Sequence, residues 1–290
     1  MSGPIAVLGA NGVFARHLLP RLRAAGHEVV AIVRRPEAAG LAQALGCTVR
    51  IADIYNRPAL TAALEGCGTG INIATSLPGP SGRGDFAAND RLRSEGTANW
   101  TGACRDAGVG RILQQGIAMV AATGRANWGD EETTFAGKPD SRLGHAVAAA
   151  LAMETDIRDS DIDFAILRGG LFYGPGTGLD TTWLARAKEG TLVVPDDGTD
   201  YVSLIHVADM AAATARAVER FPSGQTLIVC DDCPVIWNDL FAHIAALAGQ
   251  PPPPTGAPLG YPSFRLSNAR ARAALDWAPF YPSYREGFAR

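Results

Sequence analysis

Lysine is nearly absent from this sequence. Of 26 basic side chains only two, Lys138 and Lys188, are lysines, and neither follows a tyrosine by four residues. No uncharged apolar run approaches the ~20 residues of a membrane helix, and the first residues lack the basic flank of a secretory signal. The net charge of -3 gives no general attraction to nucleic acid or to an anionic membrane. We therefore expect a cytoplasmic protein that acts on a small molecule, with no nucleic-acid or membrane partner.

Cysteine is also scarce, with five residues in the chain. Without an export signal these thiols are expected to stay reduced. Cys230 and Cys233 form a C-x-x-C pair, but one pair without a second pair or nearby histidines is weak evidence for zinc. We expect no metal site, with Cys230 ending a buried strand and Cys233 lying in the turn before Pro234.

Strand and helix patterns alternate through the first 167 residues. The first strand, 4–8, is one apolar run, as is typical of a parallel strand buried on both faces. Residues 12–25 repeat apolar side chains at helical spacing, and Gly26 ends that helix. Further strands are expected at 27–33, 47–51, 69–74, 111–115 and 163–167, with helices at 36–45, 58–64, 89–107 and 142–160. This order predicts an α/β fold, a Rossmann-like doubly wound parallel sheet.

The alternation breaks up after residue 167. Glycine and proline cluster in 169–178, and a proline run occupies 251–254. The expected elements are helices at 181–188, 207–220 and 236–248 and short strands at 192–194, 203–205 and 226–230. We predict an NAD(P)-binding Rossmann domain at 1–168, joined by about 201–221, and a small discontinuous C-terminal substrate-binding lobe at 169–200 and 222–290.

The turn after the first strand carries the pattern of a dinucleotide site. It reads Gly9-Ala-Asn-Gly12-Val-Phe-Ala15, between a strand and a helix. Gly9 allows a tight turn, Gly12 lets backbone approach a pyrophosphate, and Ala15 lets helix and strand pack closely. The helix N-terminus would offer N–H groups and partial positive charge to the phosphates.

Two arginines, Arg34 and Arg35, follow the second strand, where an acidic residue would bind an unphosphorylated ribose. Because a guanidinium can bind a 2′-phosphate, we predict NADP as the cofactor, with NAD as the alternative. A solvated arginine pair is the other interpretation. Asp53 ends the third strand and is placed to accept from an adenine amino group, or else to cap the following turn.

Several motifs in order resemble those of the extended short-chain dehydrogenase/reductase superfamily, in its NAD-dependent epimerase/dehydratase-like branch. They are Gly9–Ala15, Asp53, Asn72–Thr75, Asn89 through Asn99, Arg168–Gly176, Leu204–Asp209 and Ser267–Asn268. The resemblance spans nearly the whole chain. It implies that Ala74 and Thr75 line the nicotinamide ribose, that Gly169–Phe172 pass beside the nicotinamide, and that Tyr173 and Tyr201 face the substrate lobe. The complete cofactor set is expected to be Gly9, Asn11, Gly12, Val13, Phe14, Arg34, Arg35, Asp53, Ile54, Ala74, Thr75, Gln115, Gly169, Leu171 and Phe172.

The family's catalytic set is missing. That set is a Ser or Thr after the fifth strand and a Tyr-x-x-x-Lys on the following helix, where the Lys lowers the pKa of the Tyr from ~10. Gly116 stands where the Ser is expected. Counting from Glu154, the Tyr and Lys positions fall on Ala146 and Ala150. The chain therefore resembles an atypical member of the superfamily.

Three functions stay open. An oxidoreductase could act without the usual set, because orientation alone contributes about 7–11 kcal/mol to the rate of hydride transfer. His145 or Tyr173 could then donate the proton, although each could equally be structural. The second function is a catalytically inactive NADP-binding sensor that regulates a partner, and the third is a lyase or epimerase. Glu131 and Glu132 could serve that third chemistry, or simply be solvated.

Aromatic and apolar side chains cluster in segments expected to rim the substrate cleft. The expected substrate-binding residues are Met119, Trp128, Tyr173, Trp183 and Tyr201. They favour a small, fairly hydrophobic substrate over a sugar phosphate, although aromatic residues also fill cores. Residues 78–84 are expected to form a mobile lid. The protein is expected to be a monomer or a homodimer.

Overall fold

The computed structural model describes residues 3–78, 84–256 and 262–288. Packing divides the chain into two compact units, each built from three segments. The first unit comprises Met1–Gly116, Ala148–Leu167 and Ala211–Thr226, and the second comprises Ile117–Val147, Arg168–Met210 and Leu227–Arg290. Most of the expected lid, 79–83, lies outside the described residues. Within the described ranges, no helix combines the length and apolar character that crossing a bilayer requires.

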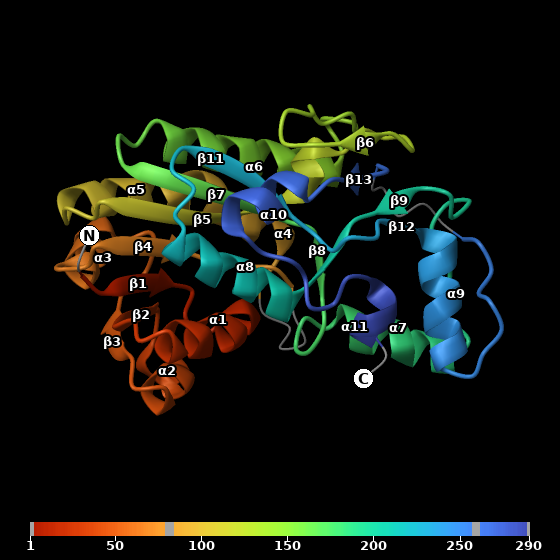
Figure 1. Cartoon of the computed structure of the whole chain (residues 1–290), viewed down its shortest axis with the longest axis horizontal. Coiled ribbons are helices and arrows are strands. Elements are labelled where there is room, and N and C mark those ends of the chain that lie inside the picture. Colours follow the sequence, from red (N-terminus) through yellow and green to blue (C-terminus); the bar gives the residue numbers. More distant parts are fainter. Residues whose placement is uncertain (1–2, 79–83, 257–261, 289–290) are drawn as a thin grey trace. The chain divides into compact units, whose positions relative to one another are not determined.

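A seven-stranded sheet organises the first unit, with the strand order β11-β7-β5-β4-β1-β2-β3 (Figure 1). Its strands are β1 (Ile5–Leu8), β2 (Val29–Val33), β3 (Thr48–Ile51), β4 (Thr69–Asn72), β5 (Arg111–Ile117), β7 (Asp163–Gly169) and β11 (Gln225–Val229). β1 pairs in parallel with both β2 and β4, and the strand order reverses at β1. The predicted doubly wound parallel sheet is confirmed. The strand expected at 226–230, which the prediction placed in the substrate-binding lobe, is instead β11, the edge strand of this sheet.

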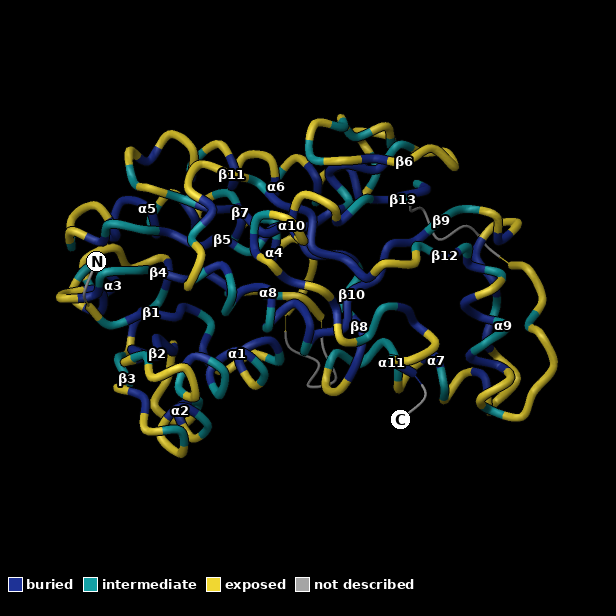
Figure 2. The backbone as a smooth tube through the Cα atoms, viewed as in Figure 1, coloured by how far each residue is buried: buried dark blue, intermediate teal, exposed yellow. Residues whose placement is uncertain are grey.

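Helices cover this sheet and bury its strands. The helices of this part are α1 (Val13–Ala24), α2 (Gly40–Ala44), α3 (Arg57–Leu64), α4 (Phe86–Arg91), α5 (Thr97–Asp106), α6 (Arg142–Arg158) and α8 (Val207–Glu219). All residues of β1 and β2 are buried, as Figure 2 shows. One core cluster joins Leu8 and Ile32 of the strands to Leu60 of α3, Trp100 of α5 and Ile157 of α6. Apolar burial on this scale is the main stabilising term of the unit.

Two predicted helices are interrupted. In place of a helix at 36–45 there is a 3-10 turn, Pro36–Ala38, followed by the short α2. The helix expected at 89–107 begins earlier, because Asp85 caps it by accepting from the N–H of Ala88. A π-helical segment, Leu92–Gly96, then separates α4 from α5. The apolar periodicity indicated helix at both places but carried no signal for a change in hydrogen-bond pattern.

The second unit is built largely from elements too short to predict. Its strands are β6 (Trp128–Gly129), β8 (Leu171–Tyr173), β9 (Tyr201–Val202), β10 (Leu204–His206), β12 (Val235–Ile236) and β13 (Arg265–Leu266); its helices are α7 (Leu179–Lys188), α9 (Trp237–Leu247), α10 (Ala269–Leu275) and α11 (Tyr284–Phe288), with a 3-10 turn at Ala118–Ala121. The prediction of a strand at 192–194 is wrong. Val194 makes only an isolated bridge with Thr255.

Candidate functional site

The turn between β1 and α1 has the geometry of a phosphate-binding loop. Gly9 has φ +86°, and a Cβ built there would lie 2.7 Å from the Cα of Ala74. Only glycine therefore fits this turn. Gly12 begins α1, and in the described structure no side chain caps that helix end. Uncapped N–H groups beside an exposed glycine fit the pyrophosphate of a dinucleotide.

The ends of β2 and β3 carry the residues expected near the adenosine. Arg34 and Arg35 directly follow β2, are exposed, and make no ion pair with the described residues. Asp53 follows β3 and is half-buried, and its Oδ1 accepts a 2.9 Å hydrogen bond from the N–H of Tyr55. Asn56, not Asp53, caps α3. Asp53 thus stabilises the turn and leaves its second oxygen for a ligand.

Further predicted cofactor residues lie at the ends of β4 and β5. Ala74 and Thr75 follow β4, and the amide of Ala74 is held by a 3.1 Å hydrogen bond to Oδ1 of the buried Asn72. Gln115 lies in β5, and its side chain donates to the backbone oxygen of Gly116. Because β1 to β5 are neighbours in one sheet, the predicted residues of the first unit gather at the carboxyl ends of adjacent strands. That edge is where such sheets bind ligands.

The remaining predicted cofactor residues belong to the second unit. Gly169 ends β7, and Leu171 and Phe172 lie in β8, which pairs in parallel with β10. A Cβ on Gly169 would lie 2.3 Å from the ring of Phe172, so a larger residue there would require that ring to move. Leu171 packs against the core of this unit.

Tyr173 does not have the surroundings of a proton donor. Its side chain is fully buried, stacked on Phe288 with ring centroids 5.1 Å apart and edge-on to His206. Its hydroxyl donates to the backbone oxygen of Ser283 at 3.3 Å. Burial, followed by the charge of Asp231, raises its pKa far above the ordinary value. The predicted catalytic role of Tyr173 is therefore corrected to a structural one, because a buried phenol held by backbone cannot reach substrate.

Two of the expected substrate-binding residues also belong to the core. Trp183 is 8% exposed and packs against Trp237 and Phe241. Met119 is half-buried against the same cluster. Their pattern in the sequence could not separate a cleft wall from a core, because aromatic side chains dominate both. This corrects the substrate-binding prediction for Trp183.

Helix α6 is where the family's catalytic tyrosine and lysine would be expected, and it contains neither. Its 17 residues include neither tyrosine nor lysine. Ala146 is half-buried and Ala150 is fully buried, so no polar group replaces the missing pair from these positions. Gly116 is the next-to-last residue of β5. His145, by contrast, is exposed near the start of α6.

Trp128 and Tyr201 are brought together by a residue that sequence reasoning missed. The guanidinium carbon of Arg265 lies 4.5 Å from the ring centroid of Trp128 and 4.6 Å from that of Tyr201. β13 pairs with β6, placing Arg265 opposite Trp128. On the other side, Phe264 donates to the backbone oxygen of Tyr201. No motif in the sequence marked Arg265, since its two ring partners lie 64 and 137 residues away along the chain.

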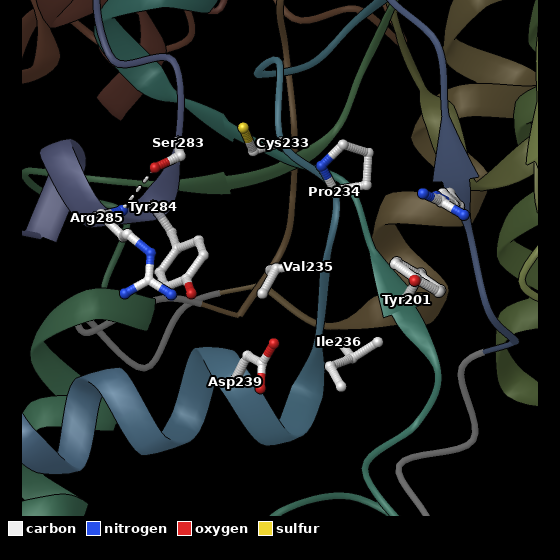
Figure 3. A pocket seen from close by; sticks show the side chains of 10 residues that line it. Tyr201, Cys233, Pro234, Val235, Ile236, Asp239, Ser283, Tyr284 and Arg285 are labelled. Atoms are coloured by element: carbon white, nitrogen blue, oxygen red, sulfur yellow. Dashed lines mark hydrogen bonds between the residues drawn. The ribbon is translucent and has the colours of Figure 1, made fainter.

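A cavity of about 390 Å³ in the second unit opens beside this arginine. Its polar lining residues are Tyr201, Cys233, Asp239, Arg265, Ser283, Tyr284 and Arg285. Figure 3 shows Tyr284 and Arg285 on one side and Tyr201 on the other, with Val235 and Ile236 between them. Burial raises the pKa of Tyr284, which stays a neutral donor.

The two cysteines of the C-x-x-C segment are free thiols in different surroundings. Cys230 follows the end of β11 and is fully buried, whereas Cys233 is exposed. Burial raises the pKa of both thiols. Between them, Asp231 is 1% exposed, and neither of its carboxylate oxygens has a hydrogen-bond partner of normal geometry among the described residues.

The comparisons with known proteins agree with this architecture. Residues 5–230 match the model of the "NAD dependent epimerase/dehydratase family". The chain is 35% identical to a 3-diazoavenalumate denitrifying reductase from a Streptomyces species, over 99% of each chain. It is 27% identical to a 2-alkyl-3-oxoalkanoate reductase of Shewanella oneidensis, over 85% of this chain and 66% of that protein. The structure of a dTDP-glucose 4,6-dehydratase double mutant from Streptomyces venezuelae, with NAD bound, superposes with a TM-score of 0.83 at 18% identity, covering 99% and 94% of the two chains.

Proposed function

The chain belongs to the NAD-dependent epimerase/dehydratase family, and we propose that within it the protein is an NADPH-dependent reductase of a small, apolar organic acid. We propose further that hydride goes to the cationic diazonium group of a diazo compound, an acceptor that needs no proton from the enzyme. The observation that carries this proposal is the absence of tyrosine and lysine from α6. A ketone reductase of this fold would need an acid at that position.

The names of the relatives support both parts of the proposal. One relative is a reductase of a diazo compound and acts with loss of nitrogen, and the match covers almost all of both chains. Two relatives act on substrates whose names end in -ate, which are carboxylate anions. An acidic substrate with an apolar body agrees with the aromatic and cationic lining of the second unit.

The chemistry balances without a proton donor. A bound dihydronicotinamide would supply one hydride, which is two electrons and a proton nucleus. A diazonium group, R–N₂⁺, that accepts hydride on its terminal nitrogen becomes the neutral diazene R–N=N–H. The diazene then breaks its R–N bond, leaving R–H and N₂. The roles of the protein are to orient the two partners and to exclude water, which together account for a large share of the barrier reduction.

In this proposal the residues of the first unit hold the cofactor. The turn at Gly9 and Gly12 and the first N–H groups of α1 bind the pyrophosphate. Arg34 and Arg35 pair with the 2′-phosphate, since both guanidiniums are exposed and lack an ion pair among the described residues. Asp53 accepts from the adenine, and Ala74 and Thr75 contact the nicotinamide ribose.

The substitution Arg34→Glu tests the cofactor preference. A charge-assisted hydrogen bond contributes about 1.5–3 kcal/mol, so NADPH binding is expected to weaken roughly 10- to 100-fold. NADH has no 2′-phosphate, and its Kd is expected to change by less than about 3-fold. Calorimetric titration of both cofactors measures this, with the exposed Arg125→Glu as a control of equal charge change. Unchanged preference in Arg34→Glu would remove the arginine from the phosphate site.

Turnover of a matched pair of substrates tests the reaction class. With a benzoate that carries a diazonium group on its ring, we expect NADPH to be oxidised, which is followed at 340 nm. One N₂ should be released for each NADPH consumed. The corresponding acetylbenzoate, which has a ketone in place of the diazonium, is expected to give no turnover. A reaction without enzyme corrects for spontaneous reduction. Faster turnover of the ketone than of the diazonium would replace this function by ketone reduction.

Ketone reduction is the second candidate, because one relative is named as an oxoalkanoate reductase. It would require a proton donor, and His145 is an exposed titratable group on α6. Under the proposed function, His145→Ala is expected to leave kcat on the diazonium within about 2-fold of wild type, because no proton is transferred. A loss of 100-fold or more, in the range of a missing general acid, would favour the second candidate. Steady-state kinetics decide between them.

A further inference from the structure

Arg265 is a cation that lies between two aromatic rings and makes no ion pair with a described residue. The rings of Trp128 and Tyr201 flank its guanidinium at 4.5 and 4.6 Å, which restricts its rotation and stabilises its charge. Its only hydrogen bond within the described residues goes to the backbone oxygen of Ala126 at 3.3 Å. Nε is buried and has no hydrogen-bond partner there. Burying a donor without a partner costs free energy, which an acceptor reaching this guanidinium would offset.

The cavity beside Arg265 is lined by two cations and one carboxylate. Arg265 and Arg285 both line it, and neither makes an ion pair with a described residue. Asp239, in the first turn of α9, is the one carboxylate among the lining residues. Glu286 lies next to Arg285 in the sequence and accepts a hydrogen bond from Ser283; that hydrogen bond, and to a smaller extent the charge of Arg285, lower the pKa of Glu286. The lining therefore carries two cations against one anion.

The same cavity offers apolar and aromatic surface. Tyr201 and Tyr284 face each other across it, and Val235 and Ile236 lie between them (Figure 3). A volume of about 390 Å³ is within the range of small-molecule sites and exceeds what a bare inorganic ion needs. The ligand that matches this lining is an acid with a flat, apolar body.

We propose that this cavity binds the carboxylate of an aromatic acid, with the guanidinium of Arg265 pairing with the carboxylate. Tyr201 and Ile236 then contact the ring, and Arg285 adds to the positive potential at the far wall. The identity of this acid as the substrate rests on the proposed function, whereas the carboxylate site itself does not. A planar guanidinium fixed between two rings matches a carboxylate in two parallel hydrogen bonds.

Equilibrium binding of cinnamate and of its neutral isostere cinnamamide tests the site. With wild-type protein and no cofactor, cinnamate is expected to bind at least about 10-fold more tightly than the amide. Arg265→Gln should abolish that difference. Arg265→Lys should restore part of it, because it returns the charge without the planar fork. The exposed Arg125→Gln, with the same change in net charge, should bind as wild type. Calorimetry measures each Kd, and thermal unfolding confirms that each variant is folded.

Four results would overturn the proposal: no cinnamate binding at millimolar concentration, equal binding of acid and amide, unchanged preference in Arg265→Gln, or an equal loss in Arg125→Gln. If Arg265→Gln does not fold, the comparison of wild type with Arg265→Lys decides, and identical preference in the two refutes the paired geometry. Because these measurements involve no turnover, they separate the two proposals. Arginine-dependent cinnamate binding by a protein that leaves the diazonium intact would retain the site and refute the reductase.

Discussion

Replacing Gly9 by alanine is expected to weaken binding of NADPH at least 100-fold and to lower the free energy of unfolding by about 2–5 kcal/mol. Two costs add at this position. The backbone has φ +86°, where an L side chain is strained. The new methyl group would also lie 2.7–2.8 Å from the Cα and N of Ala74, and backbone atoms cannot move away cheaply. The turn must shift, and the amides that we propose bind the pyrophosphate shift with it.

Gly26→Ala is a matched control for the first of these two costs. Gly26 ends α1 with φ +84°, but a Cβ there meets nothing within 4 Å. We expect a loss of about 1–2 kcal/mol from backbone strain and an unchanged Kd for NADPH. Urea unfolding and calorimetric titration measure both quantities in both variants. If Gly9→Ala binds NADPH as tightly as wild type does, the turn is not the pyrophosphate site, and the cofactor assignment loses its base.

Replacing Asp231 by asparagine is expected to stabilise the protein at neutral pH, by an amount that grows as the pH rises. Burial raises the pKa of Asp231 well above its ordinary value, and Asp232, Asp209 and Glu286 raise it further. The amide of Cys233 offsets this only in part. Tyr173, Cys230 and Cys233 also interact with Asp231, and they are neutral because their pKa values are raised. Asp231 is therefore protonated in the folded protein under conditions where the unfolded chain has lost that proton.

The sign of the pH dependence follows from this proton. Above the unfolded pKa of about 3.9 the folded state binds one more proton than the unfolded state, so stability falls with pH. The slope is about 1.4 kcal/mol per pH unit until the folded pKa is reached. An asparagine side chain cannot ionise, so the difference in unfolding free energy between Asp231→Asn and wild type should grow with that slope. Below about pH 4 the two proteins should converge.

Urea unfolding at pH 5, 6, 7 and 8 measures the difference, with the exposed Asp140→Asn as the control. The control should follow the wild-type curve at each pH. A constant difference between Asp231→Asn and wild type across this range would mean that Asp231 is ionised in the folded protein. A buried, ionised Asp231 would then need a group that stabilises its negative charge.

The first unit could be derived from the sequence because its signals are local. A strand buried on both faces, such as β1 or β2, is a continuous apolar run, and the Gly9 turn follows it at once. The family comparison confirms the resemblance that these motifs indicated. The placing of Arg34, Asp53 and Thr75 at neighbouring strand ends followed from the parallel order alone.

The second unit could not be derived in the same way, because its defining pairs are distant along the chain. Two-residue strands such as β6 and β13 have no periodicity to detect, yet they place Arg265 beside Trp128. Tyr173 was misassigned for a related reason. Its burial depends on Phe288 and on the backbone of Ser283, more than 100 residues away. Local sequence indicates that a ring is present but not which surface will cover it.

The path of the chain through the two units limits which fragments of the protein can fold. Each compact unit draws on three separate stretches, and the stretches alternate along the polypeptide. A gene fragment that begins at the first residue and ends before residue 226 would leave both units short of part of their interior. Exchanging the second unit with that of a relative would require three simultaneous grafts, so changes of specificity in this scaffold are more accessible by point substitution than by recombination.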